Sequence, residues 1–474
     1  MRHGEVFSIW DSIPSDKDKP KDEKLSAEFE ALNNTLTSEK WREHCLHKRE
    51  TFSPIVTYLA QLMAHDVAFS VKFDIQSASP ARVRQMRPSN LRTNPLSLDT
   101  IYGEGLHLDP QFYVPLDFLG RKPSAEFALN SYDHPEWEQT VTLPAFSLNF
   151  QRWGKRNKIP LEHLVPRLAD PRNADQPILM QITAEFMSYH NRWVKALRSS
   201  NPKRYSAPEV AFQAARALTV LTYHNILLHE LGDQVCCRDG TRSIGRPPVG
   251  KDTFQGVFRA FHCLALDRYH LQDGAKSETL LRMLAWDTCK PRLKLGKNTA
   301  SLADAIRASL ESWSVDWAIR WDVFLDPDVN KTAFTPSFSA GFGDKPIFEK
   351  DRAAAEEHEV STLGKYRHLS PCVEKLLEDI QNHGSNHKLK PKNLPLHLAF
   401  LAEGYCEQES GTLGPTASAA VRQFLDTNIR VVRDKYLGIL DQLRLVKLAD
   451  GLPKNFADMR KSKPKLPSTK GALA

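Results

Sequence analysis

The sequence has little cysteine for its length, with seven cysteines in 474 residues. No two of them have the spacing of a zinc site, and Cys236 and Cys237 are adjacent instead of forming a CxxC pair. An odd number of thinly spread cysteines argues against a disulfide scaffold. The seven residues are Cys45, Cys236, Cys237, Cys263, Cys289, Cys372 and Cys406.

Long apolar runs are absent as well. The first residues contain no apolar core of a secretion signal, and no apolar run reaches the length of about 20 residues that spans a bilayer. We therefore expect a cytoplasmic protein with no membrane span, although leaderless export stays open. The net charge of +7 is modest for this length, so no nucleic-acid partner is expected.

Strand-like alternation is scarce and there is no internal repeat, whereas helical periodicity recurs along the chain. The sequence therefore predicts a mainly α fold, with one large helical domain, long loops and little strand. Residues 75–170 are Pro-rich and loop-like. The predicted helices are the apolar segment after Ser53-Pro54, 176–200, 207–232 ending on Gly232, 253–271, 301–325 capped by Ser301, 394–409 and 416–446.

The predicted domain covers residues 50–445. Residues 1–49 are polar and form an irregular N-terminal extension. Residues 446–474 form a basic tail, and its Lys- and Pro-rich end has almost nothing to bury. This composition predicts disorder for the tail.

Three polar residues interrupt the apolar stretch "YLAQLMAHDVAFS" at positions 58–70. Gln61 and His65 are four residues apart and share one helix face, whereas Asp66 points elsewhere. A single histidine on an apolar face is most often a satisfied core residue, and this applies equally to His262 in "FRAFHCLAL". Two such helices in one helical chain also fit a haem pocket with an axial histidine.

Two loops carry further polar residues. "LADPRNADQ", at 168–176, places Arg172 where a loop runs into a long helix, either as a surface ion pair or as a rigid cationic donor. "NLRTNPLSLDTIYGEG", at 90–105, spaces Thr93, Ser97 and Asp99 either as ligands of a hard cation or as parts of a plain loop.

Taken in order, these segments resemble the animal-type haem peroxidases of the peroxidase-cyclooxygenase superfamily, most closely their compact bacterial branch. The resemblance covers about residues 50–440 and rests on five short motifs. In this sequence they are Gln61 with His65 and Asp66, the Thr93–Asp99 loop before Tyr102-Gly103, Arg172 in "ADPRNAD", His190-Asn191-Arg192, and Phe258-Arg259 with His262.

The resemblance implies a role for each motif. His65 would act as general base and then general acid on hydrogen peroxide, with Gln61 bonding a distal water or substrate. Arg172 would stabilise the charge on the leaving oxygen. His262 would be the axial ligand of the haem iron and Arg259 would pair with a haem propionate. The family's hydrogen-bond partner of the axial histidine is an Asn, for which Asp351 is the nearest candidate here.

Two departures from the family pattern concern the cofactors. Ala64 replaces the Asp that forms an ester to haem in mammalian members, and Asp175 stands where the second ester carboxylate is usually Glu. The resemblance thus implies haem b, either noncovalent or held by one ester. Asp66, Thr93, Ser97 and Asp99 are the candidate calcium ligands, but the loop has Ser and Asp in the reverse of the usual order.

The function implied is a haem peroxidase that uses hydrogen peroxide to oxidise a phenolic, organic or halide donor through a ferryl state. A fatty-acid dioxygenase of the same superfamily is one alternative. Its radical tyrosine lies three residues before the axial histidine, where this chain has Arg259, so peroxidase chemistry is favoured. The second alternative is a haem-binding member without catalysis, against which the presence of both His65 and Arg172 argues.

Overall fold

The computed structural model describes residues 52–67, 94–116, 123–134, 137, 139–148, 164–174, 176–236, 261–266, 268–272, 278–279, 283, 291–293, 301–332, 413–464 and 466. Helices make up most of this part of the chain, and its strands are short. The predicted mainly α class is therefore confirmed. The predicted helix at 394–409 lies outside the described residues.

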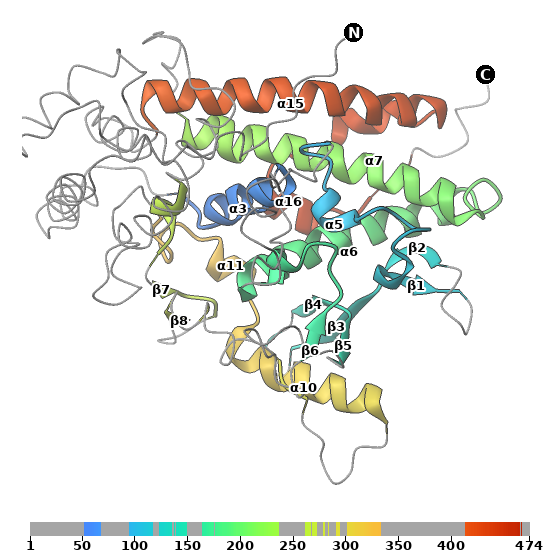
Figure 1. Cartoon of the computed structure of the whole chain (residues 1–474), viewed down its shortest axis with the longest axis horizontal. Coiled ribbons are helices and arrows are strands. Elements are labelled where there is room, and N and C mark those ends of the chain that lie inside the picture. Colours follow the sequence, from blue (N-terminus) through green and yellow to red (C-terminus); the bar gives the residue numbers. More distant parts are fainter. Residues whose placement is uncertain are drawn as a thin grey trace, which may run out of the picture. The chain divides into compact units, whose positions relative to one another are not determined.

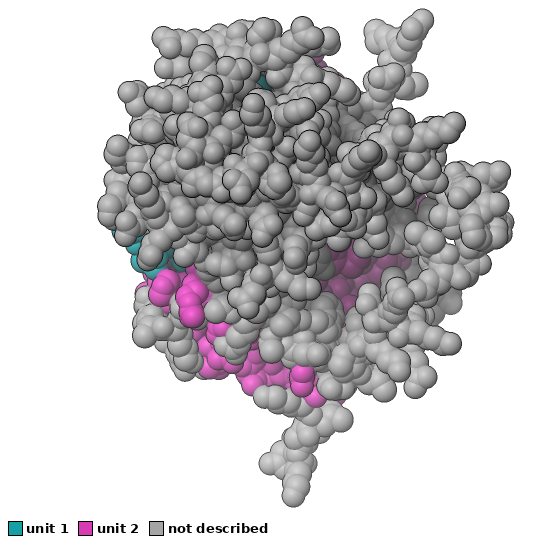
Figure 2. Space-filling model, turned by 60° about the vertical axis from the view of Figure 1, so that its left-hand side comes forward, with its two compact units in different colours: residues 1–95, 227–267, 326–428 teal, residues 96–226, 268–325, 429–474 magenta. Residues whose placement is uncertain are grey.

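The chain divides into two compact units, each assembled from three separate stretches of sequence (Figure 2). Unit 1 comprises residues 1–95, 227–267 and 326–428, and unit 2 comprises residues 96–226, 268–325 and 429–474. Each unit is described by itself below. The predicted domain boundaries at residues 50 and 445 stay a prediction.

In unit 1, helix α3 (Ile55–Val67) begins directly after Ser53-Pro54, as the sequence predicts. It packs against η4 (Leu227–Val235) and against the short 3-10 helix η6 (Phe261–Leu264). The Thr57 hydroxyl donates a hydrogen bond to the Leu264 carbonyl at 3.1 Å. This bond fastens the start of α3 to the end of η6.

Gly232 does not end a helix, contrary to the prediction. Helix α7 (Pro208–Ile226) runs without a break into η4, a π-helix that continues to Val235. A Cβ atom at Gly232 would lie 3.6 Å from Cδ1 of Leu425 on α15 (Pro415–Gln442). The glycine therefore lies close under a neighbouring side chain inside a helical stretch and does not act as a cap.

The described residues between 94 and 170 contain short strands, whereas the sequence predicted only loops there. The strands pair two by two as antiparallel ribbons, and they are too short for alternation to show in the sequence (Figure 1). The pairs are β1 (Tyr113–Pro115) with β2 (Pro123–Phe127), β3 (Leu129–Asp133) with β4 (Thr140–Pro144), and β5 (Phe146–Leu148) with β6 (Leu164–Pro166).

Helix α6 (Pro177–Ser200) is the central element of unit 2. It packs against α7 and against β2, β3 and β4. Gln176 caps its start, because the side-chain oxygen accepts a hydrogen bond from the Ile178 amide at 2.9 Å, and Pro177 occupies the first helical position. The predicted helix at 176–200 is confirmed.

One predicted helix divides into two. Ser301 caps α10 (Leu302–Trp317) as predicted, but the chain leaves the helix at Ala318 and resumes it in α11 (Trp321–Phe324). The buried amide of Gln181 explains the break. Its nitrogen donates to the Trp317 carbonyl, and its oxygen accepts from the Ile319 amide, both at 2.9 Å. These bonds replace backbone bonds that a continuous helix would make.

The predicted helix at 253–271 is wrong where the structure describes it. Only η6 is helical, and Arg268–Tyr269 form strand β7, which pairs with β8 (Glu278–Thr279). Tyr269 is fully buried. The apolar periodicity thus reflects buried side chains on a short turn and a strand.

The tail prediction is wrong for residues 446–464. These residues form the 3-10 helix η10 (Val446–Gly451) and helix α16 (Phe456–Lys461). Phe456 and Met459, three residues apart, are both fully buried, and the Phe456 ring packs against the rings of Phe186 and Trp321. This small apolar face outweighs the basic composition that predicted disorder.

Basic residues take part in docking α16. The Arg192 guanidinium donates to the Met459 and Arg460 carbonyls at the end of α16. The Arg460 guanidinium in turn pairs with Glu185 at 3.1 Å and lies over the Trp321 ring. The charged side chains of two arginines therefore help to hold α16 against the rest of unit 2.

We predict that Phe456→Ala lowers the free energy of unfolding by about 3–5 kcal/mol, because it removes a ring that is fully buried. Urea denaturation followed by tryptophan fluorescence measures the loss. Val446→Ala is the control, since Val446 is 38% exposed and its truncation should cost about 0.5 kcal/mol or less. Equal effects of the two substitutions would show that α16 does not dock.

Candidate functional site

Helix α3 carries the predicted distal residues, and its burial is uneven. Every other residue of the helix is buried, but Gln61, Ala64 and His65 are only partly buried. These three are spaced i, i+3 and i+4, so they form one stripe along the helix. Asp66 is fully buried on another side. This stripe is therefore the least buried face of a helix that is otherwise enclosed.

The same unit contains the turn of the predicted axial ligand. His262 is the second residue of η6, against which α3 packs. The structure thus brings together the backbone segments that carry His65 and His262. The side chain of His262 lies outside the described part of the chain, as do Arg259 and Asp351.

Arg172 lies in unit 2, in the short 3-10 helix η3 (Pro171–Ala174). Its guanidinium donates two hydrogen bonds to the Asp170 carboxylate. Nε lies 3.0 Å from Oδ1, and Nη2 lies 2.6 Å from Oδ2. Asp170 is completely buried, while the Arg172 side chain is 32% exposed. The ion pair that the sequence allowed as a surface feature is therefore half enclosed. Asp175 lies outside the described residues.

In the predicted calcium loop, the acidic residue Asp99 is paired with an arginine. Asp99 begins helix α5 (Asp99–Tyr102) and accepts a hydrogen bond from Arg216 at 2.8 Å. Ser97 is buried, and Thr93 lies outside the described residues. Within the described part of the chain, no group of three or more His, Cys, Asp or Glu side chains could hold a metal ion. The described residues thus give the calcium prediction no support.

The backbone of this loop is held in an uncommon conformation. Leu96 and Leu98 both have positive φ, of 63° and 57°, which few residues other than glycine adopt. Nε2 of the buried His224 donates to the Leu96 carbonyl at 2.7 Å. Burial lowers the pKa of His224 to about 4, so the ring is neutral and bonds the loop as an uncharged donor.

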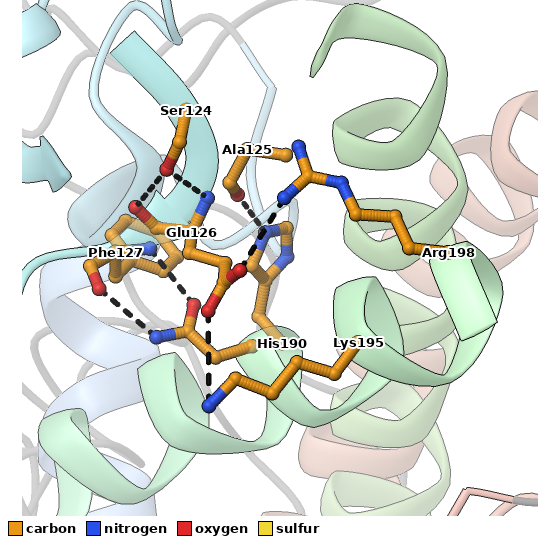
Figure 3. A network of polar contacts seen from close by, with 8 residues as sticks. Ser124, Ala125, Glu126, Phe127, His190, Lys195 and Arg198 are labelled. Carbon is orange, nitrogen blue, oxygen red and sulfur yellow. Dashed lines mark hydrogen bonds and ion pairs between the residues drawn. The ribbon is translucent and has the colours of Figure 1, made fainter. Parts of the chain in front are cut away.

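The motif His190-Asn191-Arg192 joins α6 to three other elements. Nε2 of His190 lies 2.8 Å from the Ala125 carbonyl of β2 (Figure 3). Nδ1 lies 3.0 Å from the Tyr102 hydroxyl of α5. Asn191 bonds both the amide and the carbonyl of Phe127. Arg192 reaches α16, as described above. The motif that contributed to the family resemblance is thus a set of structural anchors.

His190 is neutral in this setting. Burial lowers its pKa to about 3, opposed by the hydrogen bond to Ala125 and aided by the charge of Arg216. Burial also raises the pKa of the Tyr102 phenol, so the hydroxyl keeps its proton. Tyr102 therefore donates to Nδ1, and the proton on Nε2 is donated to Ala125.

The edge of β2 next to this motif is also held by charge. Glu126 is flanked by Lys195 and Arg198 of α6, at 3.8 Å and 3.4 Å (Figure 3). Both contacts lie near the surface, where such pairs contribute little to stability. They reinforce a placement that the buried bonds already determine.

Sequence reasoning missed the part that Asp170 plays. "ADPRNAD" contains an acidic residue on each side of Arg172, and the sequence does not say which one is buried. Asp170 also accepts a hydrogen bond from the Arg172 amide at 3.0 Å. The available signal was the position of Asp170 two residues before Arg172, which suits a carboxylate that turns back onto the following backbone.

The fold is similar to that of a solved peroxidase, in agreement with the fold that the resemblance in the sequence predicts. Among solved structures, peroxidase A from Dictyostelium discoideum is similar, with a TM-score of 0.53 and 13% identity over 97% of this chain and 92% of that one. At this identity the likeness shows the fold alone.

Two plant structures match less well. Fatty acid alpha-dioxygenase from Oryza sativa has a TM-score of 0.42 and 13% identity, covering 90% of this chain and 77% of that one. The Arabidopsis thaliana enzyme of the same name has a TM-score of 0.33 and 13% identity, covering 94% and 79%. No protein-family model matches the chain, and no curated protein matches it by sequence.

None of the helices in the described ranges is both long enough and apolar enough to cross a membrane.

We predict that acid destabilises the protein through its buried histidines. The pKa of His190 is lowered from 6.5 to about 3, so between these values the unfolded chain binds a proton that the folded chain does not. The contribution of His190 to the free energy of unfolding is therefore fully present above about pH 6.5. Towards pH 3 it falls by about 1.4 kcal/mol per pH unit for this histidine alone.

Urea denaturation at pH 7, 6, 5 and 4 measures this slope. His190→Gln should be less stable at pH 7 because it loses the bonds to Tyr102 and Ala125. Its slope should nevertheless be smaller by one proton. An unchanged slope in the variant would mean that His190 is not the titrating group.

Proposed function

We propose that the protein is a haem-dependent peroxidase that uses hydrogen peroxide to oxidise a small reductant. The observation that carries the proposal is the packing of α3 against η6 within unit 1. One segment presents a half-open stripe with His65, and the other contains His262. Helical folds hold haem between helices with an axial histidine.

The residues present fit haem in their chemistry. His262 would ligate the iron, and Arg259 would pair with a propionate. Asp175 stands at the position of the family's second ester carboxylate and would form the ester if haem is linked. Asp351 is the candidate acceptor for the second nitrogen of His262. Haem, when bound, supplies the iron centre that peroxide oxidises and the reductant restores.

His65 is the proposed proton carrier. Its imidazole would take the proton from one peroxide oxygen and deliver it to the oxygen that leaves. Its partial exposure on an otherwise buried helix gives peroxide access to the ring. Gln61 lies one turn earlier on the same stripe, where its amide would hydrogen-bond peroxide or a water.

Arg172 is the proposed electrostatic stabiliser. Negative charge develops on the leaving oxygen, and a cation fixed before the reaction stabilises it without reorganisation. The two bonds to Asp170 hold the guanidinium in one orientation. A guanidinium that is 32% exposed is also open to a small ligand.

The alternative functions lack these supports. The dioxygenases of the superfamily carry their radical tyrosine at the position of Arg259, and a dioxygenase here would have to use another tyrosine, such as Tyr269. A haem binder without catalysis needs neither a half-open His65 nor a clamped Arg172. The reductant is proposed only as a small phenolic, organic or halide donor.

We predict that protein reconstituted with haem shows a Soret band that shifts on addition of hydrogen peroxide. His262→Ala should lose haem binding, because the axial ligand is removed. His65→Ala should still bind haem but react with peroxide about 10²- to 10⁴-fold more slowly, because the proton carrier is lost. Stopped-flow absorption measures the rate, and haem titration measures the binding.

His107→Ala serves as the matched control, since its side chain is 71% exposed and lies near Glu209 on the surface of unit 2. It should change neither quantity. Equal behaviour of His65→Ala and His262→Ala would overturn the assignment of the two sides. Oxygen uptake on adding a fatty acid without peroxide would instead favour a dioxygenase.

A further inference from the structure

We propose that Asp170 is the positioning residue of Arg172: its buried carboxylate sets the orientation in which the guanidinium meets peroxide. The inference rests on the proposed function, because it gives the proposed stabiliser a partner that places it. It adds to that function a residue that none of the sequence motifs assigned.

The geometry of the pair is that of a clamp. Nε and Nη2 of Arg172 both bond the carboxylate, at 3.0 Å to Oδ1 and 2.6 Å to Oδ2. The Arg172 amide donates to the same Oδ1 at 3.0 Å. Backbone and side chain of Arg172 are thus held by one carboxylate, which fixes the side-chain torsions between them.

The carboxylate itself has little freedom to move. Asp170 is completely buried, so its charge depends on the protein for compensation. Its backbone carbonyl also accepts the Asn173 amide at 3.1 Å, which closes the turn around Arg172. The guanidinium of Arg172 can be held in one orientation only because the carboxylate that it bonds is itself fixed.

The segment that follows Arg172 is anchored as well. The Asn173 side chain donates to Thr100 of α5, at 2.9 Å to the hydroxyl and 3.3 Å to the carbonyl. Gln176 then caps α6 through the Ile178 amide. Asn173 and Gln176 are both buried, so the chain between Arg172 and the start of α6 is held at two points.

A second Arg–Asp pair two residues apart provides a comparison within the same unit. Arg320 bonds both oxygens of Asp322 at 3.2 Å, and the Arg320 side chain is 32% exposed, as is that of Arg172. Asp322, however, is 65% exposed, whereas Asp170 is fully buried. Burial of the carboxylate is therefore what distinguishes the Arg172 pair.

The central test is Asp170→Asn in the haem-loaded protein. The variant keeps the shape of the side chain and removes its charge and one of its two acceptors. We expect the second-order rate constant with hydrogen peroxide to fall about 10- to 100-fold, because a misplaced group loses much of its effect on the transition state. Haem affinity should be unchanged. Asp322→Asn, the matched control, should leave both unchanged.

A double-mutant comparison separates positioning from general damage. In Arg172→Gln the guanidinium is absent, so adding Asp170→Asn should slow the reaction no further. The double variant should also melt at a higher temperature than Arg172→Gln alone, since it no longer buries a carboxylate that has lost the guanidinium. Equal slowing by Asp170→Asn in both backgrounds would overturn the proposal.

Chemical labelling tests the clamp without haem. Phenylglyoxal modifies accessible guanidinium groups, and peptide mass spectrometry locates the modified arginines. We expect Arg172 to react slowly in the wild-type protein and several-fold faster in Asp170→Asn. Unchanged labelling of Arg172 would refute the clamp.

Asp170→Glu covers the case in which Asp170→Asn does not fold. It keeps the charge but moves the carboxylate by one methylene, so it should also slow the reaction if orientation matters. A normal rate in Asp170→Glu would show that charge alone suffices and would overturn positioning. If the wild-type haem protein does not react with peroxide, the proposed function fails, and the positioning role fails with it. The labelling experiment then reports only on the ion pair between Arg172 and Asp170.

Discussion

The hydrogen bond from the Tyr102 hydroxyl to the neutral ring of His190 connects the elements on which the Arg172 loop depends. It joins α5 to α6, and the other ring nitrogen joins α6 to β2. Because α5 also carries Thr100, which holds Asn173, the placement of α5 is transmitted to the turn around Arg172. A contact in the core of unit 2 thereby determines where a charged side chain near the surface lies.

Polar side chains in the apolar helices have two distinct uses. Gln181, His190 and His224 are buried, and each bonds backbone groups of a segment far away in the sequence. These residues satisfy backbone amide and carbonyl groups in loops and helix breaks, where no helical hydrogen bond is available. Gln61 and His65 differ, because they remain partly open on a helix that is otherwise enclosed. Exposure, more than residue type, separates the structural histidines from the candidate catalytic one.

Local signals in the sequence were sufficient for much of the fold. The cap at Gln176 and the Ser301 cap are short-range interactions, and the starts of the two helices were predicted within one residue. The break after Trp317 was not predictable, because Gln181 lies 138 residues before Ile319 in the sequence. The motifs in the sequence pointed to His65, Arg172 and His262. They did not reveal that Asp170 is buried, since burial depends on tertiary packing around a loop.

The pairing of Asp99 with Arg216 has a consequence for how this part of the chain meets its environment. Arg216 is largely enclosed and lies over the Tyr102 ring as well as against the carboxylate. A countercharge that belongs to the polypeptide cannot dissociate, and its supply does not vary between cellular compartments. The start of α5 therefore has its countercharge without any supply of metal ions, and the carboxylate is paired once the chain has folded.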